Sequence, residues 1–88
     1  MTLSFPNPAR SYDDAKSRVR FLGHDGMLEI KFFVLAEVLA GGNSQRTASE
    51  SDYLAWFDAL RPKIQTAAKK AYSARRERSI ILDLEHFR

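Results

Sequence analysis

Apolar and polar residues alternate in residues 17–21 and again in residues 28–32, and the turn-forming residues 23–26 lie between them. A period of two is typical of a strand with one buried face. Two such segments around glycine and aspartate indicate two strands joined by a tight turn. The pattern therefore predicts a β-hairpin, whose buried face consists of Val19, Phe21, Leu28, Ile30 and Phe32.

Charge favours one register of this hairpin over another. A two-residue turn at residues 25–26 would pair Phe21 with Ile30 and place Arg20 opposite Lys31, so that like charges face each other. A four-residue loop of residues 23–26 places Arg20 opposite Glu29 instead. Because both registers keep the same residues on the buried face, we expect the one that pairs Arg20 with Glu29.

Two further strands are predicted near the ends of the sequence. Residues 3–5 are typical of a short edge strand, because Pro6 and Pro8 lack the N–H group that a sheet ladder needs. Apolar residues at every second position from Ile80 to Leu84 predict a closing strand.

The apolar period changes to three and four residues after Phe33. This spacing predicts a short helix over residues 34–39, which ends at the glycine pair of residues 41–42. The polar residues 42–48 then predict a loop.

A long amphipathic helix is predicted in the next segment. Ser49 together with Asp52, or Ser51 alone, can cap its N-terminus. The apolar stripe keeps its phase across Pro62, so we expect one kinked helix rather than two separate ones. The stripe consists of Tyr53, Phe57, Leu60, Ile64, Ala67, Ala68 and Ala71.

These elements define an α+β fold with the order β-β-β-α-α-β. We expect a small antiparallel sheet with the long helix packed on one face, so that Phe57 and Ile64 are buried against the sheet. A chain of 88 residues is too short for a second core. Residues 1–88 are therefore expected to form a single domain.

Composition favours a cytoplasmic protein. The chain has no cysteine, so neither disulfides nor thiolate chemistry are available. Its N-terminus lacks the basic start and apolar stretch of a secretory signal. The longest nearly apolar stretch, residues 32–40, is about half the length of a membrane helix. We expect no membrane association.

Basic residues are concentrated in one part of the chain. Residues 61–78 contain seven Lys or Arg and one acidic residue, a net charge of +6, so the rest of the chain carries −3 of the overall +3. Such a run could neutralise phosphates, although at helical spacing the charges spread over a wide face. Weak nucleic-acid binding is thus an alternative function, with candidate contacts Lys63, Lys69, Lys70, Arg75, Arg76 and Arg78.

Two aromatic residues lie outside the expected core pattern. Trp56 is displaced from the apolar stripe of the long helix, and Phe33 shares a strand face with charged residues. Large aromatics at such positions are enriched at interfaces, and a thin core benefits from self-association. The leading interpretation is a binding or accessory module that acts through protein contacts, with homodimers included, and uses Phe33 and Trp56.

No arrangement of residues points to catalysis, a cofactor or a metal. His24 and Asp25 are neighbours in a predicted turn, where side chains usually point apart. Neither His24 nor His86 has a ligand-type residue four positions away on a helical face. The glycine pair of residues 41–42 lacks the lysine and threonine of a phosphate-binding loop. We expect a protein that is not an enzyme and binds no cofactor or metal.

Four segments together resemble a known bacterial family. They are SFPNPARSYD, RVRFLGHDGMLEIKFFV, ESDYLAWFDALRPKIQTAAKKAY and ILDLEHF, and they cover nearly the whole chain. The chain is similar to the domain of unknown function 1488 family. This resemblance implies a compact α+β fold and a bacterial cytoplasmic setting, and it brings neither an established activity nor a catalytic residue.

Overall fold

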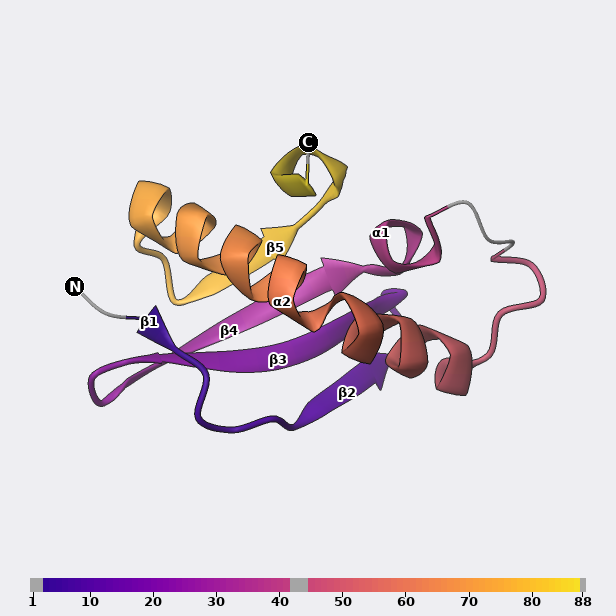
Figure 1. The fold of residues 1–88 in the computed structure, drawn as a ribbon, viewed down its shortest axis with the longest axis horizontal. Helices are drawn as coiled ribbons and strands as arrows, with labels where there is room; N and C mark the ends of the chain where they lie inside the picture. The colour runs from indigo at the N-terminus through magenta and orange to yellow at the C-terminus, as the bar shows by residue number, and fades with distance from the viewer. Residues whose placement is uncertain (1–2, 42–44, 88) are drawn as a thin grey trace.

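The strands and helices of the computed structural model, which describes residues 3–41 and 45–87, form an α+β fold as predicted (Figure 1). The strands are β1 (Leu3–Ser4), β2 (Arg10–Asp13), β3 (Arg18–Asp25), β4 (Leu28–Leu35) and β5 (Ser79–Leu82). The helices are α1 (Ala36–Ala40), α2 (Glu50–Arg75) and a short 3-10 helix, η1 (Leu84–Phe87). In Figure 1, α2 lies across one face of the sheet.

The sheet is mixed, which corrects the expectation of a purely antiparallel one. Its order is β1-β3-β4-β5, and β2 also pairs with β3. The pairs that involve β3 are antiparallel, whereas β4 and β5 are parallel. The reason is the connection: the chain leaves β4, passes through α1 and α2, and returns to begin β5 at the same end as β4 began.

β1 and β2 lie along the same edge of β3. Leu3 is paired with Asp25 at one end, and Arg10 is paired with Phe21 further along. The expected edge strand is therefore present, but it is shorter than predicted because the proline-containing residues 5–9 interrupt it. β2 was not predicted, since RSYD has no alternation of clearly apolar residues.

Both hairpin registers considered from the sequence are wrong. Arg20 lies opposite Phe33 rather than Glu29, and Phe21 lies opposite Phe32. The observed pairing differs from each of the two expected pairings by an even number of residues. The same side chains therefore face the core, and the predicted buried face is preserved.

Turn geometry and ring packing account for the observed register. The loop consists of Gly26 and Met27 alone, and only Gly26 has a positive φ (62°), as in a type II′ turn. This closure lets both strands extend to eight residues. It also stacks the rings of Phe21 and Phe32, whose centroids are 5.3 Å apart at an interplanar angle of 18°. The expected Arg20–Glu29 attraction is worth only about 0.2 to 1 kcal/mol, less than these contacts.

The predicted short helix begins later than expected. Val34 and Leu35 belong to β4, and α1 covers Ala36–Ala40 only. Val34 is fully buried between its strand partners Val19 and Leu82, which holds the chain in the extended form. The helix ends at Gly41, which has a φ of 55°; the expected cap at Gly42 and the loop residues 42–44 lie outside the described residues.

The closing strand ends earlier than predicted. β5 stops at Leu82, and Leu84, which was expected in the strand, is 43% exposed and begins η1. Asp83 causes the change of direction: its carboxylate accepts a hydrogen bond from the Glu85 N–H (3.0 Å), and its own N–H donates to His86 Nδ1 (3.1 Å).

α2 is one continuous helix, as predicted. Ser49 Oγ accepts from the Asp52 N–H (3.2 Å), and the Asp52 carboxylate accepts from the Ser49 N–H (2.9 Å). This capping box confirms Ser49 as the cap. Pro62 lies inside the helix, and the Thr66 hydroxyl donates to its carbonyl (3.0 Å).

The core lies between α2 and one face of the sheet. Phe57 and Ile64 have no exposed surface, which confirms the predicted orientation of the helix. No helix among residues 3–41 and 45–87 is long and apolar enough to cross a membrane. The largest fully buried side chains are Phe32, Phe57, Ile30, Ile64, Ile80, Leu82, Val19 and Val34.

Candidate functional site

The face of the sheet turned away from α2, here called the open face, is exposed to solvent. Along β3, β4 and β5, every second residue is buried in the core, so the intervening residues point to the opposite side. Arg20, Phe33 and Ile81 lie side by side there as strand partners. Ile81 is 49% exposed and Phe33 is half-buried.

Phe33 is fixed on the open face by a cation. The Arg18 guanidinium lies 3.8 Å from the centroid of the Phe33 ring, a distance at which the ring attracts a positive charge. Arg18 Nε also lies 3.5 Å from an Asp13 carboxylate oxygen, and its side chain is only 16% exposed. This arrangement holds an aromatic ring in place beside exposed apolar surface.

A depression of 440 Å³ lies next to Phe33 on the open face. Its walls carry the cations Arg20 and Lys31 and the anion Asp13. The apolar half of the open face is thus bordered by charged side chains, as the core of a protein interface is bordered by its rim. The complete lining is Ser11, Tyr12, Asp13, Arg20, Lys31 and Phe33.

Trp56 lies on the other side of the molecule from Phe33, because it belongs to α2. It is half-buried and meets the Tyr53 ring edge-on, with centroids 5.5 Å apart. Tyr53 in turn stacks on Tyr12 of β2 at 5.1 Å. The structure therefore does not bring the two aromatic candidates together into one surface.

The basic candidates are all exposed. Arg75 forms a 3.5 Å ion pair with Glu77, in which both side chains are more than half exposed, so the pair contributes little. The other five form no ion pair within the described part of the chain. They are Lys63, Lys69, Lys70, Arg76 and Arg78.

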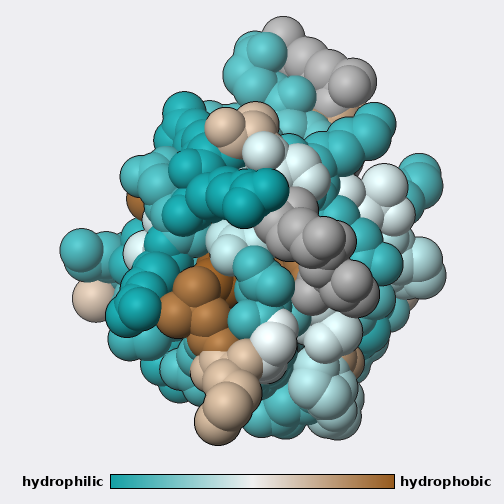
Figure 2. All heavy atoms as spheres, turned by 90° about the vertical axis from the view of Figure 1, so that its left-hand side faces the viewer, coloured by the Kyte–Doolittle hydropathy of each residue, from teal (hydrophilic) through white to brown (hydrophobic). Residues whose placement is uncertain are grey.

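Figure 2 views the end of the molecule at which α2 finishes. Its surface is predominantly hydrophilic, with only a small apolar area. Arg76, the left-handed C-cap of α2, and Arg78, whose carbonyl accepts from the Lys31 N–H (2.7 Å), belong to the connection between α2 and β5. This end of the molecule is a charged, solvated surface.

Lys63 and Lys70 have a different setting from Lys69. They line a groove of 410 Å³ between the C-terminal half of α2 and η1, to which His86 and Phe87 also contribute. Lys69 does not line this groove. The basic residues are therefore divided between two sides of the helix, in line with their spacing in the sequence.

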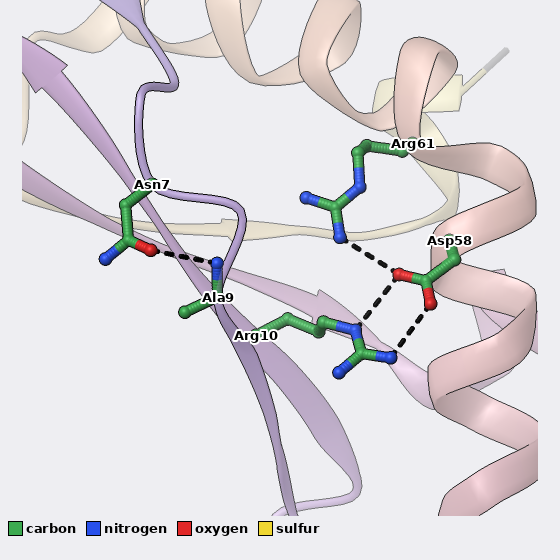
Figure 3. A network of polar contacts seen from close by, with 5 residues as sticks. All are labelled: Asn7, Ala9, Arg10, Asp58 and Arg61. Atoms are coloured by element: carbon green, nitrogen blue, oxygen red, sulfur yellow. Dashed lines mark hydrogen bonds and ion pairs between the residues drawn. The ribbon is translucent and has the colours of Figure 1, made fainter.

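An ion-pair network joins α2 to β2 (Figure 3). Asp58 accepts two hydrogen bonds from Arg10, at 3.0 and 2.8 Å, and a third from Arg61 at 2.9 Å. The Arg10 hydrogen bonds are the main reason why the pKa of Asp58 is lowered, and burial opposes them. The same contact raises the pKa of Arg10. Nearby, the Asn7 side chain accepts from the Ala9 N–H (3.0 Å), which shapes the loop before β2.

Tyrosines connect the two ends of α2 to the sheet. The Tyr72 hydroxyl donates to the Asp25 carboxylate at 2.7 Å, and this hydrogen bond is the main reason why the pKa of Tyr72 is raised. Burial is the main cause of the raised pKa of Tyr53. These contacts position the helix over the core rather than form an open reactive site.

No group of three or more His, Asp or Glu side chains that could hold a metal is found among the described residues. His24 lies in β3 opposite Glu29, and the Asp25 carboxylate accepts a hydrogen bond from Tyr72. The Nδ1 atom of His86 lies 3.0 Å from Asp83 Oδ1.

Sequence reasoning missed the groove and the network. Both depend on η1 or β2, two elements that it did not predict. The available signal for the network was Asp58, an acidic residue one turn before Arg61 on the exposed side of the helix.

The fold and the surfaces define a small α+β domain with one covered and one open sheet face. The chain belongs to the DUF1488 family, described as a protein of unknown function, which it matches over residues 3–82. No curated protein and no solved structure matches the chain. The family therefore identifies the domain without assigning an activity.

Proposed function

We propose that this chain is a non-enzymatic binding module that acts through protein contacts, and that the open face pairs with a second copy. The observation that carries the proposal is the juxtaposition of Phe33 and Ile81 on a sheet face that stays exposed, while α2 covers the opposite face. Aromatic anchors in an apolar centre dominate the energetics of protein interfaces.

The chemistry of the open face suits such a contact. The Phe33 ring is already held by Arg18, so little side-chain freedom is lost when a partner covers it. Arg20 and Lys31 border the apolar residues and supply polar contacts at the rim.

A second copy is the partner that the size of the domain favours. An 88-residue chain buries a modest fraction of its surface on folding. Two open faces packed against each other would form a double layer of sheets with an α2 helix on each outer side. Association would also add to the stability of each copy by mass action.

Sedimentation velocity at about 1 μM and about 100 μM tests this proposal. We expect a monomer at the low concentration and a growing dimer fraction at the high one. The double variant Phe33→Ser/Ile81→Ser should remain monomeric. Met27→Ser is the matched control, because Met27 is fully exposed in the β3–β4 turn. A single monomeric species of the unmodified chain at both concentrations would contradict the proposal.

Weak nucleic-acid binding is the second candidate. Its basic residues lie partly in the C-terminal half of α2 and partly in the connection that follows, because α2 ends at Arg75. This candidate is favoured by five exposed cations that form no ion pair within residues 3–41 and 45–87. Phosphate binding falls steeply with salt. Affinity for a mixed single strand at two salt concentrations tests it, and an affinity that salt does not change would exclude phosphate contacts.

The proposal includes a bacterial cytoplasmic setting. The absence of cysteine from the 88-residue sequence is in keeping with a reducing compartment. Fractionation of cells that express the chain with a small tag tests this part, and recovery in the periplasmic fraction would contradict it.

A further inference from the structure

The groove between α2 and η1 combines positive charge with an apolar wall. Its volume of 410 Å³ falls within the range of small-ligand sites. The groove lies on neither face of the sheet, so it is separate from the open face. Its lining consists of Pro62, Lys63, Thr66, Ala67, Lys70, His86 and Phe87.

Lys63 and Lys70 supply the charge of the groove. They are seven residues apart on one side of α2, about 10 Å along the helix axis. Both are exposed, and neither forms an ion pair within the described part of the chain. Two free ammonium groups along one wall suit an anion that has more than one charged oxygen.

His86 offers a hydrogen-bonding group opposite the lysines. Its Nδ1 atom lies 3.1 Å from the Asp83 backbone nitrogen and 3.0 Å from the Asp83 carboxylate, so it accepts from the N–H in one tautomer and donates to the carboxylate in the other. These contacts orient the ring, and they leave Nε2 without a partner among the described residues. A ring fixed in this way can bind a ligand with little loss of side-chain entropy.

The remaining wall of the groove is apolar. Phe87 is half-buried and packs against the core, and Ala67 and Pro62 continue this wall along α2. An aromatic side chain beside basic groups is the combination that binds a base and its phosphate together.

We propose that this groove binds a nucleotide, with the phosphate at Lys63 and Lys70 and the sugar and base along Phe87. The proposal rests on the second candidate function, and it narrows the nucleic-acid contact from all six basic candidates to the groove. It is independent of the pairing of open faces. A free nucleotide and a nucleotide unit within a single strand share this chemistry.

Isothermal titration of the full chain at low salt tests the proposal, with AMP, a thymidine decanucleotide and inorganic phosphate as the three probes. The comparison uses Lys63→Gln/Lys70→Gln, which changes the groove, and Lys69→Gln/Arg76→Gln, which removes the same charge from basic candidates outside the groove. The groove variant should lose about tenfold in affinity or more, because two charge-assisted contacts disappear. The second variant should lose much less.

Each probe result decides one part of the proposal. Binding of AMP indicates a free nucleotide, and binding of the decanucleotide alone indicates a unit of a single strand. Either result supports the groove when the groove variant loses more affinity than the second variant. Equal losses of affinity in the two variants would contradict the groove as the binding site. The second candidate function, nucleic-acid binding by the basic residues, would then still stand. If inorganic phosphate binds as tightly as AMP, the sugar and base contribute nothing, and the proposal of a nucleotide ligand is wrong. Absence of binding by all three probes would overturn both the groove and the second candidate.

Discussion

The two faces of the sheet are built from the same three strands, β3, β4 and β5, yet they have opposite chemistry. On the covered face, Val19, Phe32 and Ile80 are almost completely buried under α2. On the open face, the residues that alternate with them include Arg20 and the 49% exposed Ile81. Position along the strand therefore decides whether a residue lies in the core or on the open face.

Under the proposed function, this difference separates residues that stabilise the fold from residues that associate. Burial of large apolar side chains on the covered face supplies the main favourable free energy of folding. The open face buries less apolar surface, so it contributes less to folding. Changes on the covered face should therefore alter stability, and changes on the open face should alter association.

The largest expected effect is that of Phe57→Ala on the covered face. The side chain is completely buried, so its truncation should cost about 3 to 5 kcal/mol of unfolding free energy. Phe33→Ala removes the same ring from the open face and should cost about 1 kcal/mol or less, mainly through the lost contact with Arg18. Urea unfolding of both variants measures the two values.

Equal costs for the two substitutions would break the comparison. They would mean that Phe33 is as important for folding as Phe57. The proposed division between a covered face that stabilises the fold and an open face that associates would then be wrong.

Local patterns in the sequence were sufficient for the covered face. The period of two around Val19 and the longer period around Phe57 identify core residues without knowledge of the partner strands. Register and strand direction could not be obtained in this way, because shifts by two residues leave the buried face unchanged. The pairing of Arg20 was therefore decided by Gly26 and by ring packing.

The second largest effect is expected at Gly23, where side chains of the core pack directly against the backbone. A Cβ atom on Gly23 would lie 2.9 Å from Phe32 Cε2 and 3.1 Å from a Leu3 side-chain carbon. Gly23→Ala should therefore cost about 1 to 3 kcal/mol through overpacking. Thermal unfolding measures the loss, and a variant as stable as the unmodified chain would show that the rings move aside freely.

Gly26→Ala provides the control for Gly23→Ala. Gly26 has open space around its Cβ position but a positive φ of 62°. Its substitution should cost about 1 kcal/mol, from backbone conformation alone.

The candidate surfaces were harder to predict than the core. Phe33 and Trp56 were selected for the same reason, and the structure places them on opposite sides because one belongs to β4 and the other to α2. The groove beside Lys63 needed η1, whose start depends on side-chain hydrogen bonds of Asp83 rather than on an apolar pattern.

A smaller effect is expected at the contact between α2 and β2, where the Asp58 carboxylate accepts hydrogen bonds from Arg10 and Arg61. Because the folded pKa of Asp58 is lowered, its stabilisation is present above the unfolded pKa of about 4 and is lost as the pH falls through the folded pKa. Asp58→Asn should cost about 1 kcal/mol or less at pH 7, since the carboxylate is 46% exposed.

Urea unfolding at pH 7 and at about pH 2.5 measures this dependence. The difference between Asp58→Asn and the unmodified chain should shrink at the lower pH. Asp14→Asn is the control, because Asp14 is exposed and has no ion pair within residues 3–41 and 45–87. If the difference in stability is the same at both pH values, the Asp58→Asn substitution destabilises the fold through altered packing and not through the loss of the carboxylate charge.

The smallest effect is expected at Tyr72, which closes one end of the covered face. Its hydroxyl donates to Asp25, and the folded pKa is raised above the ordinary tyrosine value, first by this hydrogen bond and then by burial. The contribution is therefore complete below the unfolded pKa of about 10 and is lost as the pH rises through the folded pKa, since ionised Tyr72 cannot donate and would face the Asp25 carboxylate as a like charge. Tyr72→Phe should lower the urea midpoint at pH 7 by a small amount, and this difference from the unmodified chain should disappear at higher pH. Tyr53, whose pKa is raised mainly by burial, is present in both proteins and cancels in the comparison. A difference that persists unchanged to about pH 11 would show that Tyr72 stabilises the covered face through its ring alone, and not through the bond to the β3–β4 hairpin.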